Sequence, residues 1–312
     1  MQKIVTLTLN PAIDKSTSVQ SIIPEKKLRC ALPKFEPGGG GINVSRAIKK
    51  LGGESTAIYL TGGYSGKHFR HLLDLENIES CVVEFDGHTR ENLIVVDESS
   101  NAQYRFGMPG PALKNNEWQT FLDILQQSNG VEYIVASGSL PEGVPEDFFG
   151  RLACIAKKKN ARLIVDTSGE PLRHAMDEGV FLIKPNLGEL SNLYGKEELI
   201  EADIEKAAQA VIAKGGCEVM VISMGPSGAM LVTKDTVLEA PSPTVKKRST
   251  VGAGDSMVAG MVLALLKKLD WLEVLQNGIA AGTAATMNPG TELCTKEDVD
   301  RLLCWLKTKR YS

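Results

Sequence analysis

The sequence lacks the cysteine and histidine patterns by which metal-binding and redox proteins are recognised. No two of its six cysteines stand in C-x-x-C spacing, and no histidine pair accompanies them. Zinc sites and dithiol redox sites need such spacing, so both classes are excluded. Scattered cysteines in a chain of 312 residues are typical of reduced thiols in a cytoplasmic protein. The six are Cys30, Cys81, Cys154, Cys217, Cys294 and Cys304.

Long apolar runs are also missing. The longest, Met257 to Leu266, is far too short to span a bilayer. The first residues, MQKIVTLTLNPAID, interrupt their apolar run with threonines and Asn10, which predicts a strand rather than a signal peptide. We therefore expect a soluble, cytoplasmic protein with no membrane partner.

An excess of charge of either sign is missing as well. The 35 basic and 38 acidic side chains give a net charge of −3, and the basic clusters KKK (157–159) and KKR (246–248) are short. A nucleic-acid-binding surface needs a larger basic patch, so we expect no nucleic-acid partner. The hydrophobic content of 43% is that of an ordinary globular protein. The length suits two average domains or one large α/β domain.

Short strand-like runs alternate with helical ones through most of the chain. β-Branched runs predict strands at 3–9, 55–60, 132–138, 161–166, 180–185 and 219–223. Apolar residues three and four positions apart predict amphipathic helices at 44–51, 118–125 and 204–212. This alternation indicates an α/β fold with a largely parallel sheet and helices on both faces. Since no repeat or Ser/Pro-rich linker interrupts it, residues 1–312 are interpreted as a single domain.

Two stretches break the alternation, at residues 15–36 and 88–107. Both contain strands and turns without helices, and the second is typical of a hairpin with ESSNAQ as its turn. We expect the two to pair into one small sheet that covers a site as a lid; a surface decoration is the alternative. Their basic residues favour the lid, because such a set suits an anionic ligand. These are Lys26, Lys27, Arg29, Arg90 and Arg105.

The stretch STVGAGDSMVAG, residues 249–260, combines a glycine-rich turn with the start of an apolar helix. A helix N-terminus preceded by glycines offers unpaired N–H groups and a positive dipole end, which suit a phosphate. Asp255 stands at this point. Taken alone, the stretch allows Asp255 to be a helix cap or a base beside a bound phosphate.

Two earlier motifs also indicate a ligand. In PGGGGINVSRA (37–47) four glycines lead into a helix opened by Asn43, which favours close backbone approach to a ligand over a flexible loop. Asp14 in NPAID follows the first predicted strand, at the end where open α/β sheets bind ligands, although a turn residue would stand there equally well.

Two later motifs are typical of a nucleotide site. In KPNLGEL (184–190) Asn186 and Glu189 could share a water or metal shell beside polyphosphate, or Glu189 could be a first-turn helix acid. SMGPSGA (223–229) is a strand and a turn able to carry a nucleotide against its backbone.

The common nucleotide fingerprints are missing. Met257 takes the place of the third glycine of a G-x-G-x-x-G pattern, and His68 follows Gly66-Lys67 where a P-loop needs serine or threonine. No H-R-D or D-F-G stretch supports a protein kinase. A nicotinamide-dependent oxidoreductase is disfavoured for the same reason.

Taken together, GGGGINVSRA, KPNLGEL, SMGPSGA and STVGAGDS resemble, in order and spacing, the ribokinase-like (PfkB-type) carbohydrate kinases. LTLNPAID, LRC, FEPGGGGIN, YRFGMPG, SGSLPEGV and NPGTELC resemble more narrowly the type-2 6-phosphofructokinase branch, and the resemblance runs from about residue 3 to about residue 305. It implies a ribokinase-like fold and an ATP-dependent kinase that uses magnesium. The expected reaction phosphorylates the 1-hydroxyl of fructose 6-phosphate to give fructose 1,6-bisphosphate.

The resemblance also assigns roles to residues of the glycine-rich turn. It implies that Asp255 is the general base that takes the proton of the sugar hydroxyl. It implies that the amides of Gly252, Ala253 and Gly254 form an anion hole for the transferring phosphoryl group. Phosphoryl transfer needs positioning, charge stabilisation and an aimed base, so these roles agree with its chemistry.

The remaining roles are carried over position by position. Sugar-binding positions are matched by Asp14, Gly39, Gly40 and Asn43, positions around the sugar's phosphate by Arg90 and Lys27, and a position near the substrate by Ser139. The nucleotide and magnesium region is matched by Lys184, Asn186, Glu189, Ser223 and Gly225, with Asp166 assisting through water. Positions that bind a monovalent cation such as K⁺ are matched by Ser249, Val251, Ala285, Asn288 and Gly290.

The sequence departs from the family pattern at two positions. Lys247 stands on the adenine side where a small hydroxyl residue is expected, and Glu292 stands where an arginine is expected. The resemblance further implies a homodimer formed through the lid strands. Alternative activities are phosphorylation of tagatose 6-phosphate or of fructose 1-phosphate, and a different class is an inactive sugar-phosphate sensor. The intact Asp255 and Glu189 weigh against the sensor.

Overall fold

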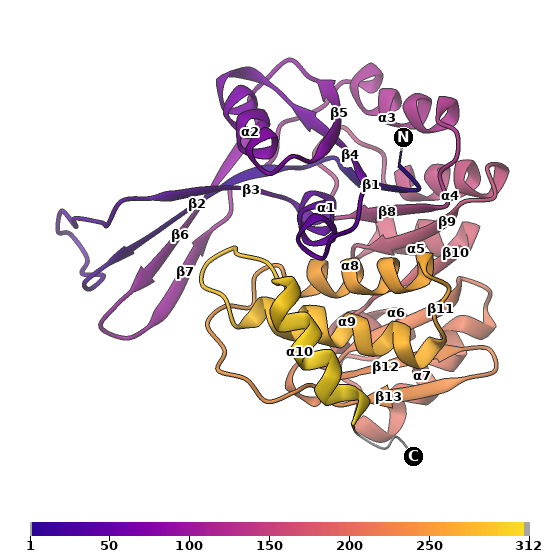
Figure 1. Ribbon diagram of the computed structural model, residues 1–312. Helices are drawn as coiled ribbons and strands as arrows, with labels where there is room; N and C mark the ends of the chain where they lie inside the picture. The colour runs from indigo at the N-terminus through magenta and orange to yellow at the C-terminus, as the bar shows by residue number, and fades with distance from the viewer. Residues whose placement is uncertain (1, 309–312) are drawn as a thin grey trace.

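A computed structural model describes residues 2–308, and its largest element is a nine-stranded sheet (Figure 1). Its order is β13-β12-β11-β10-β9-β8-β1-β4-β5. Strands from β11 to β5 run parallel, whereas β12 and β13 are antiparallel additions. The strands are β1 (Ile4–Thr8), β4 (Thr56–Thr61), β5 (Glu79–Glu84), β8 (Tyr133–Ser137), β9 (Arg162–Asp166), β10 (Val180–Ile183), β11 (Cys217–Ser223), β12 (Ala229–Thr233) and β13 (Val237–Ala240).

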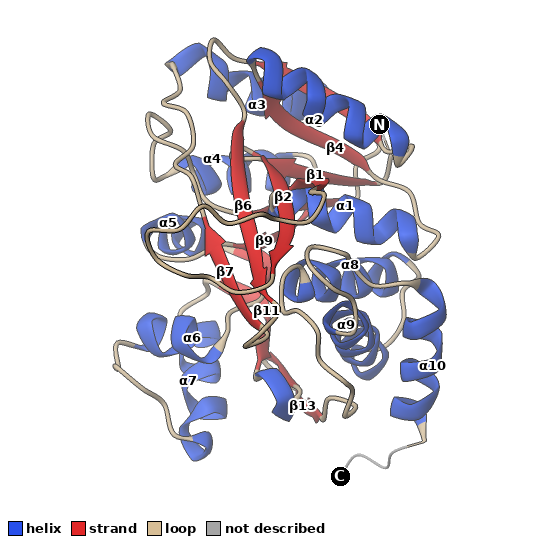
Figure 2. Cartoon of the chain, turned by 90° about the vertical axis from the view of Figure 1, so that its left-hand side faces the viewer, coloured by secondary structure: helices blue, strands red, loops and turns tan. Residues whose placement is uncertain are grey.

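Helices cover both faces of this sheet, as Figure 2 shows. One face carries α3 (Asn115–Gln127), α4 (Phe148–Lys158), α5 (Glu170–Glu178), α6 (Leu187–Tyr194) and α7 (Glu201–Ala213). The other carries α1 (Gly40–Lys50), α8 (Ala253–Leu266), α9 (Trp271–Thr286) and α10 (Lys296–Lys307), with α2 (Gly63–Leu75) packed beside α1. The predicted α/β architecture, its six strands and its three helices are confirmed.

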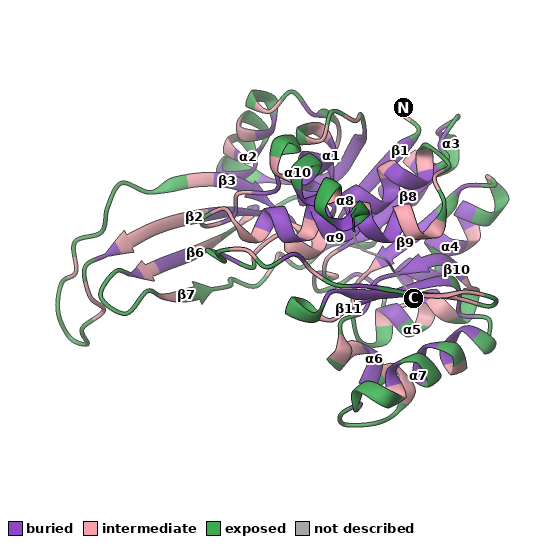
Figure 3. Ribbon diagram, turned by 60° about the horizontal axis from the view of Figure 1, so that its bottom comes forward, coloured by how far each residue is buried: buried purple, intermediate pink, exposed green. Residues whose placement is uncertain are grey.

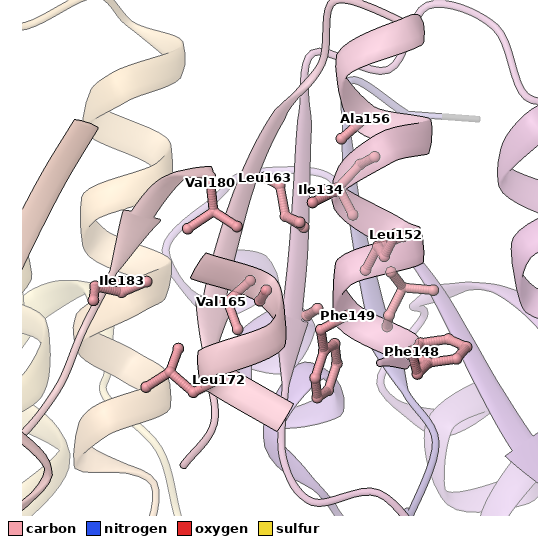
Figure 4. Packing of buried hydrophobic residues seen from close by; sticks show 14 of the residues in the cluster. Ile134, Phe148, Phe149, Leu152, Ala156, Leu163, Val165, Leu172, Val180 and Ile183 are labelled. Atoms are coloured by element: carbon pink, nitrogen blue, oxygen red, sulfur yellow. The ribbon is translucent and has the colours of Figure 1, made fainter. Parts of the chain in front are cut away.

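The larger hydrophobic cluster lies between the central strands and helices α4 and α5 (Figure 4). Phe148 and Phe149 of α4 are buried and pack edge to face, with ring centroids 5.6 Å apart. Strand residues such as Ile134 and Val165 are fully buried against them. Because helices cover both faces, the strand sequences are continuous apolar runs rather than alternating ones. A rigid sheet of this kind holds the residues that follow its strands in fixed positions.

A separate four-stranded sheet projects from the carboxyl edge of the main sheet (Figures 1 and 2). It consists of β2 (Ala12–Val19), β3 (Lys34–Gly38), β6 (Arg90–Asp97) and β7 (Ala102–Phe106), in the order β3-β2-β6-β7. Strands β6 and β7 form the predicted hairpin, and β2 pairs with β6 in parallel. The two predicted β insertions therefore do pair, and their outer loops are exposed (Figure 3). We call this element the lid sheet; its covering role and the limits of a single domain stay predictions.

Buried charged groups tie the base of the lid sheet to the main body. Arg46 of α1 lies within 3.3 Å of Glu36 on β3 and 2.7 Å of Glu76 after α2. Thr291 donates a hydrogen bond of 2.6 Å to Glu36. Glu36, Arg46 and Thr291 are all less than 7% exposed, at 6%, 2% and 2%. Removing one partner would leave a buried charge uncompensated. The network therefore fixes the position at which β3 leads into the glycines at the start of α1.

Among the described residues, no helix is long and apolar enough to cross a membrane. The run Met257 to Leu266 forms most of α8, which is buried almost throughout. All six cysteines are free thiols in the described part of the chain.

Candidate active site

The predicted site residues converge at the carboxyl edge of the parallel sheet. A cavity of about 560 Å³ lies there, and its lining includes Gly40, Ser137, Ser139, Asp166, Glu189 and Asp255. Ser137 ends β8 and Asp166 ends β9, and the two are register partners. Strand ends of a parallel sheet meet at one edge, which is why residues distant in the sequence share this cavity.

Asp255 lies in the first turn of α8, just after the glycine-rich turn. Gly252 is the N-cap residue with φ of 71°, and a Cβ atom there would lie 2.4 Å from Leu293. No side chain caps the helix. The Asp255 carboxylate instead accepts hydrogen bonds from Asn43 at 3.0 Å and from Ser137 at 3.4 Å. The cap interpretation is thus not what the structure shows, and the positive end of α8 is left for an anion.

The environment of Asp255 tunes its proton affinity. Burial, and secondarily the nearby Asp166 carboxylate, raise the pKa of Asp255 to about 7, against the lowering influence of Asn43, Lys184 and Ser137. The carboxylate therefore becomes ionised close to neutral pH. A general base is most effective with a pKa near the working pH, so this shift suits proton abstraction.

Lys184 supplies a buried positive charge beside the glycine-rich turn. Its side chain is 7% exposed, and its Nζ lies 3.3 Å from Asp166. A Cβ atom on Gly254 would lie only 3.4 Å from this Nζ. Burial alone would lower the pKa of Lys184, but Asp166, Asp255 and Glu189 raise it above its usual value. The ammonium group thus stays charged next to the place where the α8 amides point.

Asn186 and Glu189 form a reciprocal capping box at the start of α6. The Glu189 amide donates to Asn186 Oδ1 at 2.9 Å, and the Asn186 amide donates to Glu189 Oε2 at 2.9 Å. Glu189 is therefore the first-turn acid that the sequence allowed. Its Oε1 accepts no hydrogen bond from the described residues, and the side chain lines the same cavity as Asp166 and Asp255. One carboxylate oxygen remains for a cation.

Several buried polar atoms of residues behind the cavity lining have no hydrogen-bond partner in the described part of the chain. Within the described residues, six buried side-chain N or O atoms have no hydrogen-bond partner. Four of these belong to Thr8, Asn10, Asn43 and Arg90. Buried polar groups are normally paired, so these four atoms are candidates for hydrogen bonds to a bound molecule or to water.

Asp14 and Arg90 come from the lid sheet. Asp14 accepts a hydrogen bond of 2.8 Å from Asn92, and burial raises its pKa in spite of Asn92 and Arg90. The Arg90 guanidinium donates to the carbonyls of Asn10 at 2.9 Å and Met108 at 3.1 Å, while its Nε has no partner. These bonds hold Arg90 over the carboxyl end of β1 and leave other N–H donors of its guanidinium group, including Nε–H, without a partner among the described residues.

Gly39 and Gly40, at the start of α1, must be glycines because other residues of the protein approach them closely. Gly39 has φ of 114°, which side-chain-bearing residues rarely adopt. A Cβ atom on Gly40 would lie 2.2 Å from Ser137 Oγ. The sequence predicted close approach by a ligand; the structure shows that Thr8 and Ser137 already approach these glycines.

Other predicted residues lie further from Asp255. Ser139 accepts a hydrogen bond of 3.0 Å from Asn10. Ser223 donates through its amide to the Pro185 carbonyl, beside Asn186, and Gly225 is exposed with φ of 59°. Lys27 is exposed in the loop between β2 and β3 and makes no described polar contact with the site. One chain alone therefore does not bring Lys27 to the cavity.

The predicted monovalent-cation residues lie between the α8 turn and the loop after α9. Ser249 Oγ donates to the Gly290 carbonyl at 2.7 Å and accepts from the Val251 amide at 3.2 Å. The Asn288 amide donates to the Ala285 carbonyl at 3.2 Å. The segment thus carries several backbone oxygens close together.

The structure gives a local explanation for one of the two departures from the family pattern. Glu292 forms an ion pair of 2.6 Å with Lys34 on β3, which accounts for a carboxylate beside the lid base. Lys247 is exposed and nothing described in the structure explains it.

Sequence reasoning missed Ser137 and Asn10 as site residues. Both stand within the motifs SGSLPEGV and NPAID, in which the resemblance assigns roles only to Ser139 and Asp14. Their side chains contact Asp255 and Ser139, respectively. The only local signal was a polar residue at or just past the end of an apolar strand, which does not identify its partner.

Comparison with known proteins agrees with this geometry. The profile of the pfkB family carbohydrate kinases matches residues 4–298, and the chain belongs to that family. It is 45% identical to the ATP-dependent 6-phosphofructokinase isozyme 2 of Escherichia coli (strain K12), over 98% of this chain and 99% of the relative. It is 33% identical to the 1-phosphofructokinase of Bacillus subtilis (strain 168), over 98% and 99%.

Solved structures give the same result. Crystal structures of phosphofructokinase-2 from Escherichia coli with potassium and with fructose 6-phosphate superpose with TM-scores of 0.94 and 0.93, at 45% and 43% identity. A tetrameric inhibited form of the same enzyme gives 0.92 at 44% identity. Each match covers 98% of this chain and all of the other. The fold is ribokinase-like, and the chain is a carbohydrate kinase.

The capping box makes Glu189 a clean target for testing metal binding. We predict that Glu189→Gln raises the magnesium concentration for half-maximal rate by about tenfold or more. The substitution removes the negative charge of a carboxylate that is expected to hold the ion. The glutamine carbonyl can still accept the Asn186 amide, so the melting temperature should change little. Kinetic titration with MgCl₂ measures the effect; an unchanged magnesium curve in folded protein would leave Glu189 as a helix-capping residue only.

Proposed function

We propose that this protein transfers the γ-phosphoryl group of ATP to the 1-hydroxyl of fructose 6-phosphate, giving fructose 1,6-bisphosphate and ADP. The observation that carries the proposal is the Asp255 carboxylate. It lies at the N-terminus of α8 without capping it, and its pKa of about 7 suits a base at neutral pH. The 45% identical Escherichia coli relative, a 6-phosphofructokinase over its full length, supports the choice of reaction.

The chemistry follows from the positions of the charged groups. Asp255 takes the proton of the sugar 1-hydroxyl, the freed oxygen attacks the γ-phosphorus, and the bond to the β-phosphate oxygen of ADP breaks. Amides of Gly252, Ala253 and Gly254 at the start of α8, with Lys184 beside them, stabilise the negative charge on the transferring group. Positioning and such preorganised charge are the main contributions a protein makes to phosphoryl transfer.

Magnesium fits the acidic side of the cavity. Asp166 and Glu189 are oxygen donors that line the cavity with Asp255, and Glu189 keeps one unpaired carboxylate oxygen. Mg²⁺ is commonly held by one or two carboxylates together with waters and substrate phosphates. Glu189 would hold the ion directly or through water, and Asp166 would hold it through water. When bound, the ion would neutralise phosphate charge. The nucleotide that carries these phosphates would contact Asn186, Ser223 and Gly225.

The phosphosugar is assigned to the side of the cavity nearest the lid sheet. Asp14, Gly39, Gly40 and Asn43 would hold the sugar, and Ser139 lies near it. Arg90 would bind the 6-phosphate, because an arginine can give two parallel charge-assisted hydrogen bonds. The unpaired atoms of Asn43 and Arg90 support this assignment.

The lid sheet is the proposed dimer interface. Among described residues, nine large apolar side chains are exposed, and five of them lie in or directly beside the lid strands. These are Ile23, Leu32, Tyr104, Phe106 and Met108. Exposed apolar groups gathered on one element mark an interaction surface. A homodimer through this surface would also explain Lys27, which could reach the phosphosugar of the partner subunit.

Two further assignments complete the proposal. The backbone oxygens near Ser249, Val251, Ala285, Asn288 and Gly290 would bind a monovalent cation such as K⁺, as potassium is bound in an Escherichia coli relative's structure. ATP and sugar phosphates are charged and do not cross membranes, so the enzyme is placed in the cytoplasm.

Phosphorylation of fructose 1-phosphate is the second candidate activity. The 33% identical 1-phosphofructokinase from Bacillus subtilis, matched over nearly its full length, is the observation that favours it. Tagatose 6-phosphate differs from fructose 6-phosphate at one stereocentre and is the third.

Replacing Asp255 with asparagine tests the mechanism. Asp255→Asn keeps the shape and removes the base, so kcat should fall by about 10² to 10⁴ with little change in substrate KM. In the wild type, kcat should fall as pH drops below about 7, because Asp255 becomes protonated. Steady-state kinetics across pH measure both effects. Near-normal kcat in Asp255→Asn would remove Asp255 from the chemistry.

Replacing Arg90 tests the assignment of the phosphosugar. Arg90→Ala should lower kcat/KM for fructose 6-phosphate at least about tenfold, mostly through KM, since hydrogen bonds to charged groups are worth roughly 1.5 to 3 kcal/mol each. Fructose, which lacks the phosphate, should be a poor substrate and lose little further. The comparison matters because Arg90 also binds two carbonyls. Equal losses for both sugars would show that its role is structural.

A further inference from the structure

Ser137 places a hydroxyl group directly at the proposed base. It is the last residue of β8 and is 5% exposed. Its Oγ lies 3.4 Å from Asp255 Oδ1, while Asn43 Nδ2 lies 3.0 Å from Oδ2. Each oxygen of the carboxylate therefore faces one donor, and the two donors come from different elements, β8 and α1.

The position of the Ser137 hydroxyl is closely fixed. Strand β8 is paired on both sides, with β1 and with β9. On the side of α1, a Cβ atom on Gly40 would come within 2.2 Å of Ser137 Oγ and within 2.8 Å of the Gly138 amide. Only a glycine at position 40 leaves room for this hydroxyl. Packing within the protein therefore requires a glycine at position 40, whether or not a ligand is bound.

The other charged groups facing Asp255 act in opposite directions. Burial and the Asp166 carboxylate on β9 favour the protonated acid, whereas Lys184 after β10 favours the carboxylate. Ser137 and Asn43 donate to the carboxylate and so favour the ionised form, which is the form that can accept a proton. Without them, burial and Asp166 would keep more of the base protonated at neutral pH.

We propose that Ser137 is a positioning residue for phosphoryl transfer: together with Asn43 it holds the Asp255 carboxylate ionised and turned toward the sugar hydroxyl. Ser137 keeps its own proton throughout; the transferred proton goes from the sugar hydroxyl to Asp255. This inference rests on the proposed function, because it needs Asp255 to be the base.

The test compares Ser137→Ala with Ser128→Ala in the full-length enzyme with ATP, magnesium and fructose 6-phosphate. Ser128 is also a buried serine, but its hydroxyl donates to the Leu125 carbonyl on α3 and makes no hydrogen bond to Asp255. Loss of a long hydrogen bond to a charged group should shift the acid limb of kcat upward by about 0.5 to 1 pH unit. The kcat of Ser137→Ala should therefore fall about three- to tenfold at pH 6 and by less than about twofold at pH 8.5. KM and the whole profile of Ser128→Ala should match the wild type.

A second variant keeps the result interpretable. Ser137→Thr retains a hydroxyl donor and should keep its acid limb near that of the wild type, whether or not its melting temperature drops. An unshifted limb in Ser137→Ala, or an equal loss at every pH, would overturn the positioning role. Failure of the proposed function looks different, since the wild type would then not phosphorylate the sugar at all.

Discussion

In the proposed reaction, the site must keep the Asp255 carboxylate ionised beside the phosphate charge that ATP brings. Asp255 and the γ-phosphoryl group of ATP carry the same sign, so they repel each other unless positive charge lies close by. The start of α8 and the buried Lys184 provide it, with Asn43 and Ser137 holding the carboxylate itself. The resulting balance raises the pKa of Asp255 to about 7, which is the range that the proposed general base requires at neutral pH.

The two sheets contribute to this balance in different ways. The main sheet fixes Ser137 and Asp166 on adjacent strands, so strand pairing sets their positions relative to each other. The lid sheet brings Asp14 and Arg90 from segments far apart in the sequence, because β2 and β6 run side by side. Buried Glu36, held by Arg46 and Thr291, joins the two parts just before the glycines of α1. A change at this junction would move Asp14 and the glycines of α1 relative to Asp255.

Much of this was predictable from the sequence because the pattern was local. Continuous β-branched runs predicted the parallel strands. The glycine-rich turn before an apolar helix indicated Asp255 as a candidate site residue. Strands β5 and β13 were missed; they are the edge strands of the sheet, where covering layers impose less of an apolar pattern. Strand β12 was missed although it is buried between β11 and β13, because its short run follows a turn directly. The sequence allowed two roles for Glu189; the capping box shows one of them, and the metal role stays a prediction. The roles of Ser137 and Asn10 could not be predicted, because their partners lie more than a hundred residues away, 118 and 129 positions along the chain.

The measurement that tests the central claim most directly is kcat/KM with ATP for a panel of fructose 6-phosphate, tagatose 6-phosphate, fructose 1-phosphate and fructose. The product of the best substrate should be identified by ³¹P and ¹³C NMR. The account predicts that fructose 6-phosphate has the highest kcat/KM and gives fructose 1,6-bisphosphate with release of one ADP. A higher value for fructose 1-phosphate, or no transfer to any of the four sugars, would contradict it.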